Sequence, residues 1–120
     1  MATTYRITVV TGAVEYAGTD ANVYITLFGS NGNSGERLLD NAADNFERGT
    51  TDVFDIQMRD IGEIRRIRIR HDNWGNCPGW FLQRVIVHKE DTDEEWVFPC
   101  HRWLAYDEQP GEVDILLDPA

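Results

Sequence analysis

Hydrophobic and polar residues alternate along most of this chain, which is the period-two pattern of β-strands that bury one face. Tyr5, Ile7 and Val9 alternate with polar neighbours, and the segments 52–58 and 64–70 repeat the pattern. Clusters of Gly, Asn, Asp and Pro, which favour turns, separate the apolar runs. The pattern predicts eight short strands, at residues 5–9, 22–28, 36–39, 52–58, 64–70, 80–89, 96–100 and 113–117.

No segment shows the apolar spacing of an amphipathic helix, so the chain is expected to be all-β. Many short strands separated by turns are typical of antiparallel sandwiches and barrels, and we predict an eight-stranded antiparallel β-sandwich. Asn31-Gly32 is a strong signal for a tight hairpin. The 120 residues contain no linker and no internal repeat, so residues 1–120 are predicted to form a single domain.

The formal net charge of −10 limits the partners of the chain. Nucleic acid is not expected as a partner, because phosphate binding needs a basic surface. Anionic lipid is disfavoured as an unaided docking surface, since it attracts basic segments. Bound divalent cations would reverse the charge locally, although a solubilising acidic surface explains the total charge equally well.

The sequence carries few signals for a cellular compartment. No apolar run approaches the roughly 20 residues that span a bilayer, and no signal peptide is visible. Cys77 and Cys100 lack the spacing of a zinc site or redox pair, so two free thiols are favoured over a disulfide. We expect a monomer that is cytoplasmic or peripheral to a membrane, or a fragment of a longer protein located there.

Sequence signatures of catalysis are absent, which indicates that the chain is not an enzyme. Neither Ser30 nor Ser34 lies in a Gly-x-Ser-x-Gly nucleophile turn. The histidines do not have the His-Glu-x-x-His spacing of a metal-dependent hydrolase. Residues 29–35 are rich in glycine but lack the Gly-Lys-Ser/Thr and following helix of a phosphate-binding loop.

Two acidic loops suggest a metal site instead. Residues 17–20, Ala-Gly-Thr-Asp, form a polar turn that leads directly into the predicted strand at 22–28. A second acidic stretch, residues 40–47, follows the predicted strand at 36–39. If both loops lie at one end of the sandwich, their hard oxygen ligands can hold Ca²⁺, which takes several oxygens in a flexible shell.

Motifs found in order along the chain resemble those of a known family. They are Tyr5-Arg6-Ile7-Thr8-Val9, the stretch 17–25, Asn45-Phe46-Glu47-Arg48-Gly49, His71-Asp72-Asn73 with Pro78-Gly79-Trp80, and Phe98-Pro99-Cys100 with Arg102-Trp103-Leu104. Over about residues 4–118 the chain resembles a PLAT, or lipoxygenase-homology, domain, most strongly those of tandem lipoxygenase-homology repeat proteins. The resemblance implies an eight-stranded β-sandwich that docks on membranes or proteins, in several members with calcium. It also implies that catalysis belongs to other domains of those proteins.

The resemblance implies which residues would bind calcium. The first loop would contribute the Gly18 carbonyl, Thr19 and Asp20. The second loop would contribute oxygens of Asp40, Asn41, Asp44, Asn45 and Glu47, with a backbone carbonyl near Ala43. Ala43 departs from the family pattern, because some calcium-binding members have glycine there.

The same residues also allow a purely structural interpretation. Thr19 and Asp20 suit a turn in which they bond to nearby backbone amides, and the stretch 40–47 suits a solvated loop. We favour calcium because at least three carboxylates without a nearby lysine repel one another, although Arg37 and Arg48 would partly neutralise them. Asp72, with Asn73, either joins the ligands or only forms its turn.

Aromatic residues near these loops suggest contact with a membrane. Trp74 lies in a turn-rich loop with no apolar periodicity that would bury it, and an exposed indole suits the lipid headgroup region. The alternative is that Trp74 folds back onto the edge of the sandwich. Tyr16 is a weaker second candidate, whereas Trp80, Trp96 and Trp103 lie in or beside strands and are expected in the core.

A row of arginines, Arg66, Arg68 and Arg70, points to one face of the predicted strand 64–70. The row meets either an acidic partner or lipid headgroups, or it pairs with Asp or Glu on a neighbouring strand, which we favour.

These expectations combine into one hypothesis and one alternative. The hypothesis is a non-catalytic, calcium-dependent module that targets membrane lipid, with Trp74 as its inserting tip. The alternative is a calcium-stabilised protein–protein interaction or scaffold domain. An exposed Trp74 beside the calcium loops would favour lipid, and a buried Trp74 would favour the scaffold.

Overall fold

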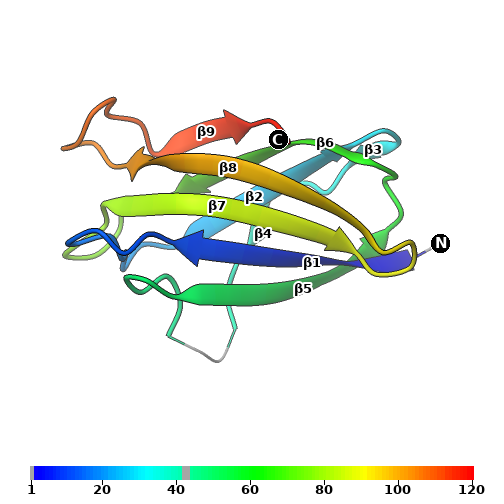
Figure 1. Cartoon of the computed structure of the whole chain (residues 1–120), viewed down its shortest axis with the longest axis horizontal. Helices are drawn as coiled ribbons and strands as arrows, with labels where there is room; N and C mark the ends of the chain where they lie inside the picture. Colours follow the sequence, from blue (N-terminus) through cyan, green and yellow to red (C-terminus); the bar gives the residue numbers. More distant parts are fainter. Residues whose placement is uncertain (1, 42–43) are drawn as a thin grey trace.

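Two antiparallel sheets pack face to face in this computed structural model, which describes residues 2–41 and 44–120 (Figure 1). One sheet has the strand order β5-β1-β7-β8, and the other has the order β3-β2-β6-β9 with β4 also paired to β2. Within the described residues the strands are β1 (Ala2–Thr11), β2 (Val23–Gly29), β3 (Gly32–Asn33), β4 (Arg37–Leu38), β5 (Thr51–Arg59), β6 (Ile64–His71), β7 (Trp80–Lys89), β8 (Glu94–Leu104) and β9 (Asp114–Leu117). This part of the chain contains no helix long and apolar enough to cross a membrane.

The prediction of an antiparallel β-sandwich is confirmed, and each of the predicted strands is present. The period-two pattern does not predict β3, which forms where the turn Ser30-Asn31 folds the chain back onto β2, so that Gly29 pairs with Gly32 and Phe28 with Asn33. Gly32 has a φ of 128°, a conformation that glycine adopts without the steric strain of a side chain. The predicted hairpin is therefore present, but its turn lies one residue earlier than Asn31-Gly32, and Gly32 is the first residue of β3.

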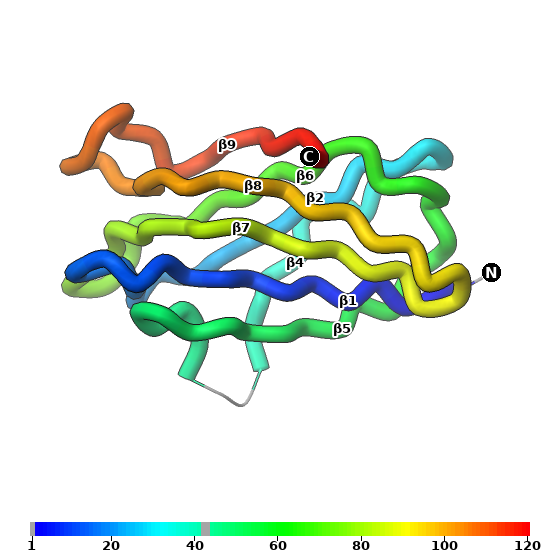
Figure 2. Tube along the Cα trace, viewed as in Figure 1, coloured from blue at the N-terminus to red at the C-terminus, as the bar shows by residue number. Residues whose placement is uncertain are grey.

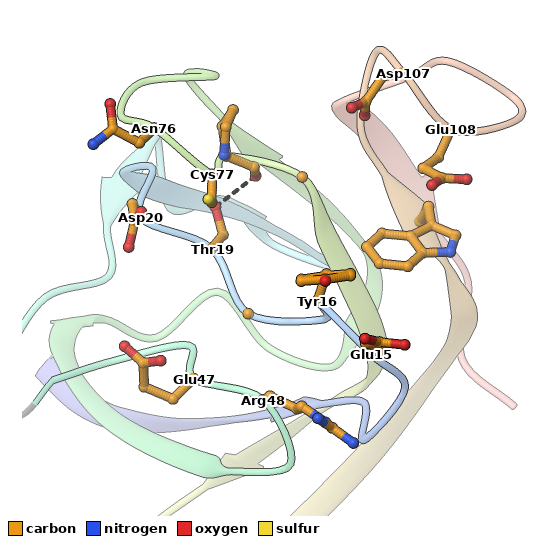
Figure 3. A pocket seen from close by; sticks show the side chains of 14 residues that line it. Glu15, Tyr16, Thr19, Asp20, Glu47, Arg48, Asn76, Cys77, Asp107 and Glu108 are labelled. Atoms are coloured by element: carbon orange, nitrogen blue, oxygen red, sulfur yellow. Dashed lines mark hydrogen bonds between the residues drawn. The ribbon is translucent and has the colours of Figure 1, made fainter.

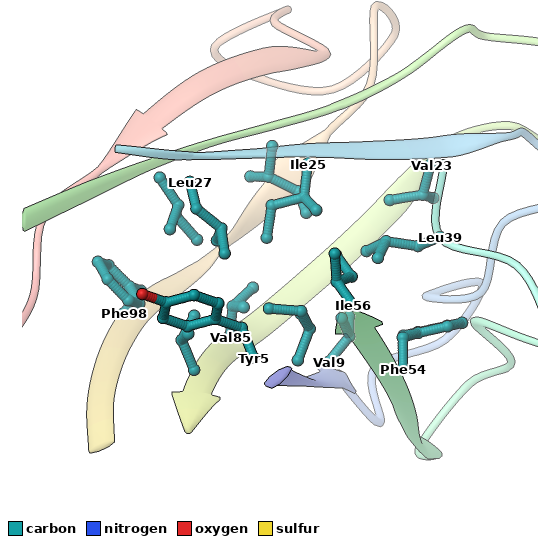
Figure 4. Close-up of a cluster of buried hydrophobic side chains, with 14 of the residues drawn as sticks. Tyr5, Val9, Val23, Ile25, Leu27, Leu39, Phe54, Ile56, Val85 and Phe98 are labelled. Atoms are coloured by element: carbon teal, nitrogen blue, oxygen red, sulfur yellow. The ribbon is translucent and has the colours of Figure 1, made fainter. Parts of the chain in front are cut away.

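The inward-facing residues of both sheets form one hydrophobic core (Figure 4). In β5 the period-two pattern is complete, because Phe54, Ile56 and Met58 are buried and their neighbours Val53, Asp55 and Gln57 are exposed. Other buried side chains shown in Figure 4 are Tyr5, Val9, Val23, Ile25, Leu27, Leu39, Val85 and Phe98. Burial of one large apolar side chain contributes about 1.5–3 kcal/mol, so this core holds the sheets from which the loops project.

Three tryptophans were predicted in the core, and they differ in burial. Trp80 is fully buried, and its indole N–H donates to Thr11 Oγ1 at 3.0 Å. Trp96 is half-buried against the core, and the half-buried Trp103 contacts Phe81 edge to face. The prediction is confirmed for Trp80 and only in part for the other two, because β8 is an edge strand with a neighbouring strand on one side only.

The arginines of β6 pair with acidic residues, as favoured from the sequence. The pairs are Arg66–Asp118, Arg68–Asp114 and Arg70–Glu36. Asp114 lies on β9 beside β6, and the hydrogen bond from Arg68 holds the pKa of the Asp114 carboxyl below its usual range. Exposed pairs of this kind contribute little to stability, so their main effect is to neutralise the row.

Four loops gather at one end of the sandwich, the left and lower left of the views in Figures 1 and 2, whereas the amino terminus lies at the other end. They connect β1 to β2, β4 to β5, β6 to β7 and β8 to β9. The two acidic loops and the loop that carries Trp74 are among these four, so the predicted site residues share one end of the fold.

Polar contacts around Tyr5 close the opposite end. The buried Tyr5 hydroxyl accepts a hydrogen bond from the Ile61 amide at 3.2 Å and donates one to the Gly62 carbonyl at 3.0 Å. Asp60 in the same turn contacts the Lys89 ammonium on β7 at 3.0 Å, and this hydrogen bond holds the pKa of Asp60 below its usual range. The turn between β5 and β6 is therefore fixed to both β1 and β7.

Replacing Tyr5 with Phe is expected to lower the free energy of unfolding by about 1–3 kcal/mol, because the buried Ile61 amide loses its acceptor. Tyr106→Phe is the matched control, since Tyr106 is exposed and its hydroxyl makes no hydrogen bond within the described residues. Urea denaturation of both variants measures the difference. Equal stability of Tyr5→Phe and the unmodified protein would show that this hydroxyl does not stabilise the fold.

Candidate functional site

The first acidic loop, residues 17–22, takes its shape from Thr19. The buried Thr19 hydroxyl donates to the Pro78 carbonyl at 2.6 Å and accepts from the Ala21 amide at 3.1 Å. This is the turn geometry that the structural interpretation of the sequence describes for Thr19. Asp20, next to it, is exposed at the mouth of the loop.

The second acidic loop is anchored by Phe46. Its ring is buried, at centroid distances of 5.7 Å from Phe54 and 5.4 Å from Trp80. The Phe46 amide donates to Asp52 Oδ2 at 2.8 Å, and the Phe46 carbonyl accepts from the Thr19 amide at 3.0 Å. The second loop is thereby joined to the core below it and to the first loop beside it.

Gly18 allows this contact between the two loops. A Cβ at position 18 would lie 3.0 Å from the Phe46 carbonyl oxygen and 3.0 Å from the Arg48 amide nitrogen. Few real Cβ contacts are that short, so a side chain here would push the loops apart. Gly18, which the resemblance assigns as a backbone ligand, is therefore also the residue at which the backbones of the two loops come close together.

The two loops enclose a polar hollow of about 230 Å³ that contains most of the predicted ligands. Its lining includes Asp20 from the first loop and Asp40, Asp44 and Asn45 from the second. Gly18 and Glu47 line the neighbouring groove, the Asn41 side-chain amide donates to the Val53 carbonyl at 3.1 Å, and Ala43 lies outside the described residues. The fold thus brings together oxygen donors that are far apart in the sequence.

The chemistry of this hollow fits a hard cation. Its polar side chains offer oxygens, the ligands that Ca²⁺ takes at variable number and geometry. Asn45 Oδ1 is buried and has no hydrogen-bond partner within residues 2–41 and 44–120, a status it shares with Thr3 Oγ1 and Arg102 Nε, so this oxygen is available to an ion or a water molecule. In the same part of the chain no three acidic, histidine or cysteine side chains are grouped closely enough to hold an ion.

Loss of solvent contact, together with neighbouring carboxylates, raises the pKa of Glu47. Partial burial raises the pKa of Glu47, and the negative charge of Asp44, a hydrogen bond shared with Asp44 and the charges of Asp20 and Asp52 raise it further. Carboxylates from both loops therefore act on one another. A bound cation would remove this repulsion.

The loop that carries Trp74 is attached to the first acidic loop. Asp72 accepts hydrogen bonds from the Asn22 amide at 3.0 Å, the Asn22 side chain at 2.8 Å and the Trp74 amide at 3.1 Å. Burial alone would raise the pKa of Asp72, but these hydrogen bonds hold it below its usual range. Asp72 therefore forms the turn, the second of the two roles open from the sequence. The Asp20 amide adds a hydrogen bond to the Cys77 carbonyl at 3.2 Å.

His71 fixes the base of the same loop. The buried imidazole accepts at Nδ1 from the Asn73 amide at 3.0 Å, and Nε2 lies 2.7 Å from the Leu104 carbonyl. This geometry makes Nε2 the protonated nitrogen, and burial lowers the pKa of His71. A neutral His71 thus joins the ends of β6 and β8 beneath the Trp74 loop.

Both candidate membrane residues are exposed at the loop end. Trp74 is 65% exposed and Tyr16 is 80% exposed. Of the two interpretations of Trp74, the exposed one is confirmed. Cys77, in the same loop, and Cys100 are free thiols as expected, and burial raises the pKa of Cys100 to about 11.

Comparison with known proteins decides the family of the chain. Residues 5–117 match the family model described as the PLAT/LH2 domain. The chain belongs to this family. It is 44% and 48% identical to lipoxygenase homology domain-containing protein 1 of Mus musculus and of Homo sapiens, in both over 97% of the chain and 6% of the relative. The resemblance recognised from the sequence motifs is therefore confirmed.

Solved lipoxygenase structures contain the fold of this PLAT domain. Coral 8R-lipoxygenase, described as activated by calcium via a C2-like domain, matches with a TM-score of 0.85 at 34% identity, over 98% of this chain and 17% of that chain. A calcium-dependent 11R-lipoxygenase matches with a TM-score of 0.75 at 32% identity, again over 98% of this chain and 17% of that chain. The PLAT domain is a non-catalytic module, and the chain spans a small part of each of these relatives.

The sequence predicts which loop residues of this PLAT domain carry candidate oxygen ligands, but it does not indicate the residues that position them. Asp52 was not recognised as the acceptor that fixes Phe46. The available signal was its register, because Asp52 occupies an inward position of β5 together with Phe54, Ile56 and Met58. A polar residue at a buried strand position generally has a hydrogen-bonding role.

Replacing Glu47 with Gln is expected to stabilise the calcium-free PLAT domain at neutral pH, because one of the repelling charges is removed. The folded-state pKa of Glu47 is raised, so the folded form binds this proton more tightly than the unfolded chain. The contribution of Glu47 to stability is therefore present below its unfolded-state pKa and is lost as the pH rises through the folded-state pKa. Thermal unfolding in chelator, from acidic to neutral pH, measures the effect.

Glu95→Gln is the control for this experiment, since Glu95 is exposed at the start of β8, away from both acidic loops. The control should leave the pH dependence unchanged. A calcium-free Glu47→Gln variant that unfolds at a lower temperature than the unmodified domain at neutral pH would contradict the repulsion described above.

Proposed function

We propose that this PLAT domain is a calcium-dependent membrane-targeting module. The observation that carries the proposal is that the loop with the exposed Trp74 is joined directly to the oxygen-lined hollow. Asp20 lines the hollow, and its amide donates a hydrogen bond to the Trp74 loop. The calcium activation described for coral 8R-lipoxygenase via its C2-like domain supports a role for calcium in this fold.

The first step of the proposed mechanism is ion binding between the two acidic loops. The carboxylates of Asp20, Asp40 and Asp44 supply the negative charge, and Asn45 Oδ1 supplies a neutral oxygen that otherwise has no partner in the described residues. Further ligands come from the Gly18 and Thr19 backbone oxygens, Asn41, the backbone near Ala43, and Glu47. The bound ion neutralises the repelling carboxylates and holds the two loops close to each other.

The second step is attachment to lipid. Calcium lowers the repulsion between the acidic loop end and lipid phosphates and can bridge the two directly. Trp74 then enters the headgroup region, with Tyr16 as a second contact, and its burial adds about 1.5–3 kcal/mol. Stable anchoring generally requires two signals, so attachment through calcium and Trp74 is reversible and places the protein at the membrane periphery.

The exposure of Trp74 favours lipid over the alternative, a calcium-stabilised protein interaction or scaffold domain. Calorimetric titration of calcium into chelator-treated protein, with and without mixed anionic and zwitterionic liposomes, separates the two. Calcium binding that tightens with lipid supports membrane targeting, because coupling between two ligands is reciprocal. Calcium binding that lipid leaves unchanged would instead support the scaffold.

Replacing Asp44 with Asn is expected to weaken calcium binding by roughly tenfold or more, the loss that even outer partners of metal ligands cause. The substitution keeps the size of the side chain and removes one charge. Asp93→Asn is the control, because Asp93 lies in the turn between β7 and β8, outside the loop end. Titration calorimetry gives both affinities, and equal values for the two variants would remove Asp44 from the site.

Replacing Trp74 with Ala is expected to leave calcium affinity unchanged and to weaken liposome binding by roughly ten- to a hundredfold, the equivalent of its burial free energy. The control is Leu116→Ala, which removes an exposed apolar side chain from β9. Co-sedimentation with liposomes at saturating calcium measures both variants. If Trp74→Ala and Leu116→Ala sediment equally, Trp74 is not the inserting tip.

A further inference from the structure

A second depression lies beside the calcium hollow at the loop end (Figure 3). This groove has a volume of about 690 Å³ and receives residues from the loops β1–β2, β4–β5, β6–β7 and β8–β9. The sequence singled out none of its outer residues except Tyr16. Of the residues that line its outer part, only Tyr16 has a role in the function proposed above, as the second lipid contact.

Two aromatic side chains form the apolar part of the groove. Trp103 lines it and is held from the side by Phe81, with ring centroids 5.5 Å apart at an interplanar angle of 85°. Tyr16 also lines it and is among the most exposed large side chains of the described residues. Exposed aromatic faces of this kind attract Lys and Arg side chains through cation–π interaction.

The charged residues of the groove are almost all acidic. Glu15, Asp107 and Glu108 line its outer part, and Figure 3 shows them on the same side as Tyr16. Asp20 and Glu47 line the part next to the calcium hollow. Among the residues that the structure describes, Arg48 is the single basic residue in the lining, and its guanidinium already donates to the Ala13 carbonyl at 2.9 Å.

We propose that this groove docks a basic segment of a protein partner, with a Lys or Arg side chain between Tyr16 and Trp103. The aliphatic stem of that side chain packs against the rings, and its charge meets the carboxylates of Glu15, Asp107 and Glu108. Charge complementarity selects this occupant, because the groove is apolar at its walls and negative at its rim. A zwitterionic lipid headgroup fits less well, since it would bring a phosphate towards the same carboxylates.

The groove and the calcium hollow share Asp20 and Thr19. If calcium binds as proposed above, it neutralises part of the charge that attracts the basic segment. The two ligands then weaken each other, and the reduction must be the same in both directions. Only this coupling rests on the proposed function; docking of the basic segment does not require calcium.

The test uses an acetylated, amidated peptide of alternating Lys and Gly, titrated into the protein in chelator and without lipid. Two-dimensional amide NMR should show saturable shifts at Tyr16, Trp103 and Glu108. The same peptide with acetylated lysines carries no charge and should cause no shifts. Absence of saturable binding by the charged peptide overturns the proposal, whatever the outcome of the calcium and liposome experiments.

A pair of double variants separates specific docking from general attraction to an acidic protein. Glu15→Gln/Glu108→Gln removes two charges from the groove, and Glu63→Gln/Glu95→Gln removes two exposed charges elsewhere. The groove variant should lose roughly three- to tenfold in peptide affinity relative to the control variant, as expected for exposed ionic contacts. Equal losses in both variants overturn the proposal.

Tyr16→Asn tests the aromatic wall without disturbing the loop. Tyr16 has a φ of 64°, a conformation that asparagine tolerates better than most residues. The variant should fold normally and bind the charged peptide more weakly than the unmodified protein. A variant that loses binding to calcium-free zwitterionic vesicles but keeps full peptide affinity would assign the groove to lipid and overturn the proposal.

Discussion

The insertion of Phe46 between Phe54 and Trp80 is the contact on which the loop end depends. Carboxylates cannot hold a loop against an apolar core, so the second acidic loop needs an apolar side chain to fix its position. Phe46 supplies this side chain. Its amide donates a hydrogen bond to the Asp52 carboxylate, and its carbonyl accepts one from the Thr19 amide. The hydrophobic core therefore sets the spacing of the two acidic loops, and hence the dimensions of the hollow between them.

The loop end combines this firm support with unfavourable electrostatics. Carboxylates from both loops raise the pKa of Glu47, and Asn45 Oδ1 is buried without a partner in the described residues. At the opposite end the charges are paired, because Asp60 meets Lys89, and the Tyr5 hydroxyl has both a donor and an acceptor, although Thr3 Oγ1 is buried without a partner in the described residues. Carboxylates that repel one another at one end of a well-packed sandwich are typical of a binding surface rather than of poor packing.

The strands could be predicted from the sequence because period-two alternation records burial directly, as in β5. The loop oxygens could also be named, since the motifs around Asp20 and Asn45 resemble those of the PLAT family. The contacts between loops could not be predicted, because no local pattern reports which loop reaches another. Asp72 illustrates this limit: its sequence neighbours fit a ligand and a turn equally well, and only the position of Asn22 assigns it to the turn.

Gly75 has no side chain, so it supplies neither a side-chain ligand for calcium nor a side-chain contact with lipid. Its backbone nevertheless lies against Asp20 so closely that a Cβ at position 75 would come within 2.9 Å of the Asp20 Cβ, and its φ is +95°. Natural selection acting on the acidic loops would therefore act on this glycine as well. In a library of variants selected for retention of the loop geometry, position 75 should tolerate almost no substitution, although an inventory of binding residues would leave it out.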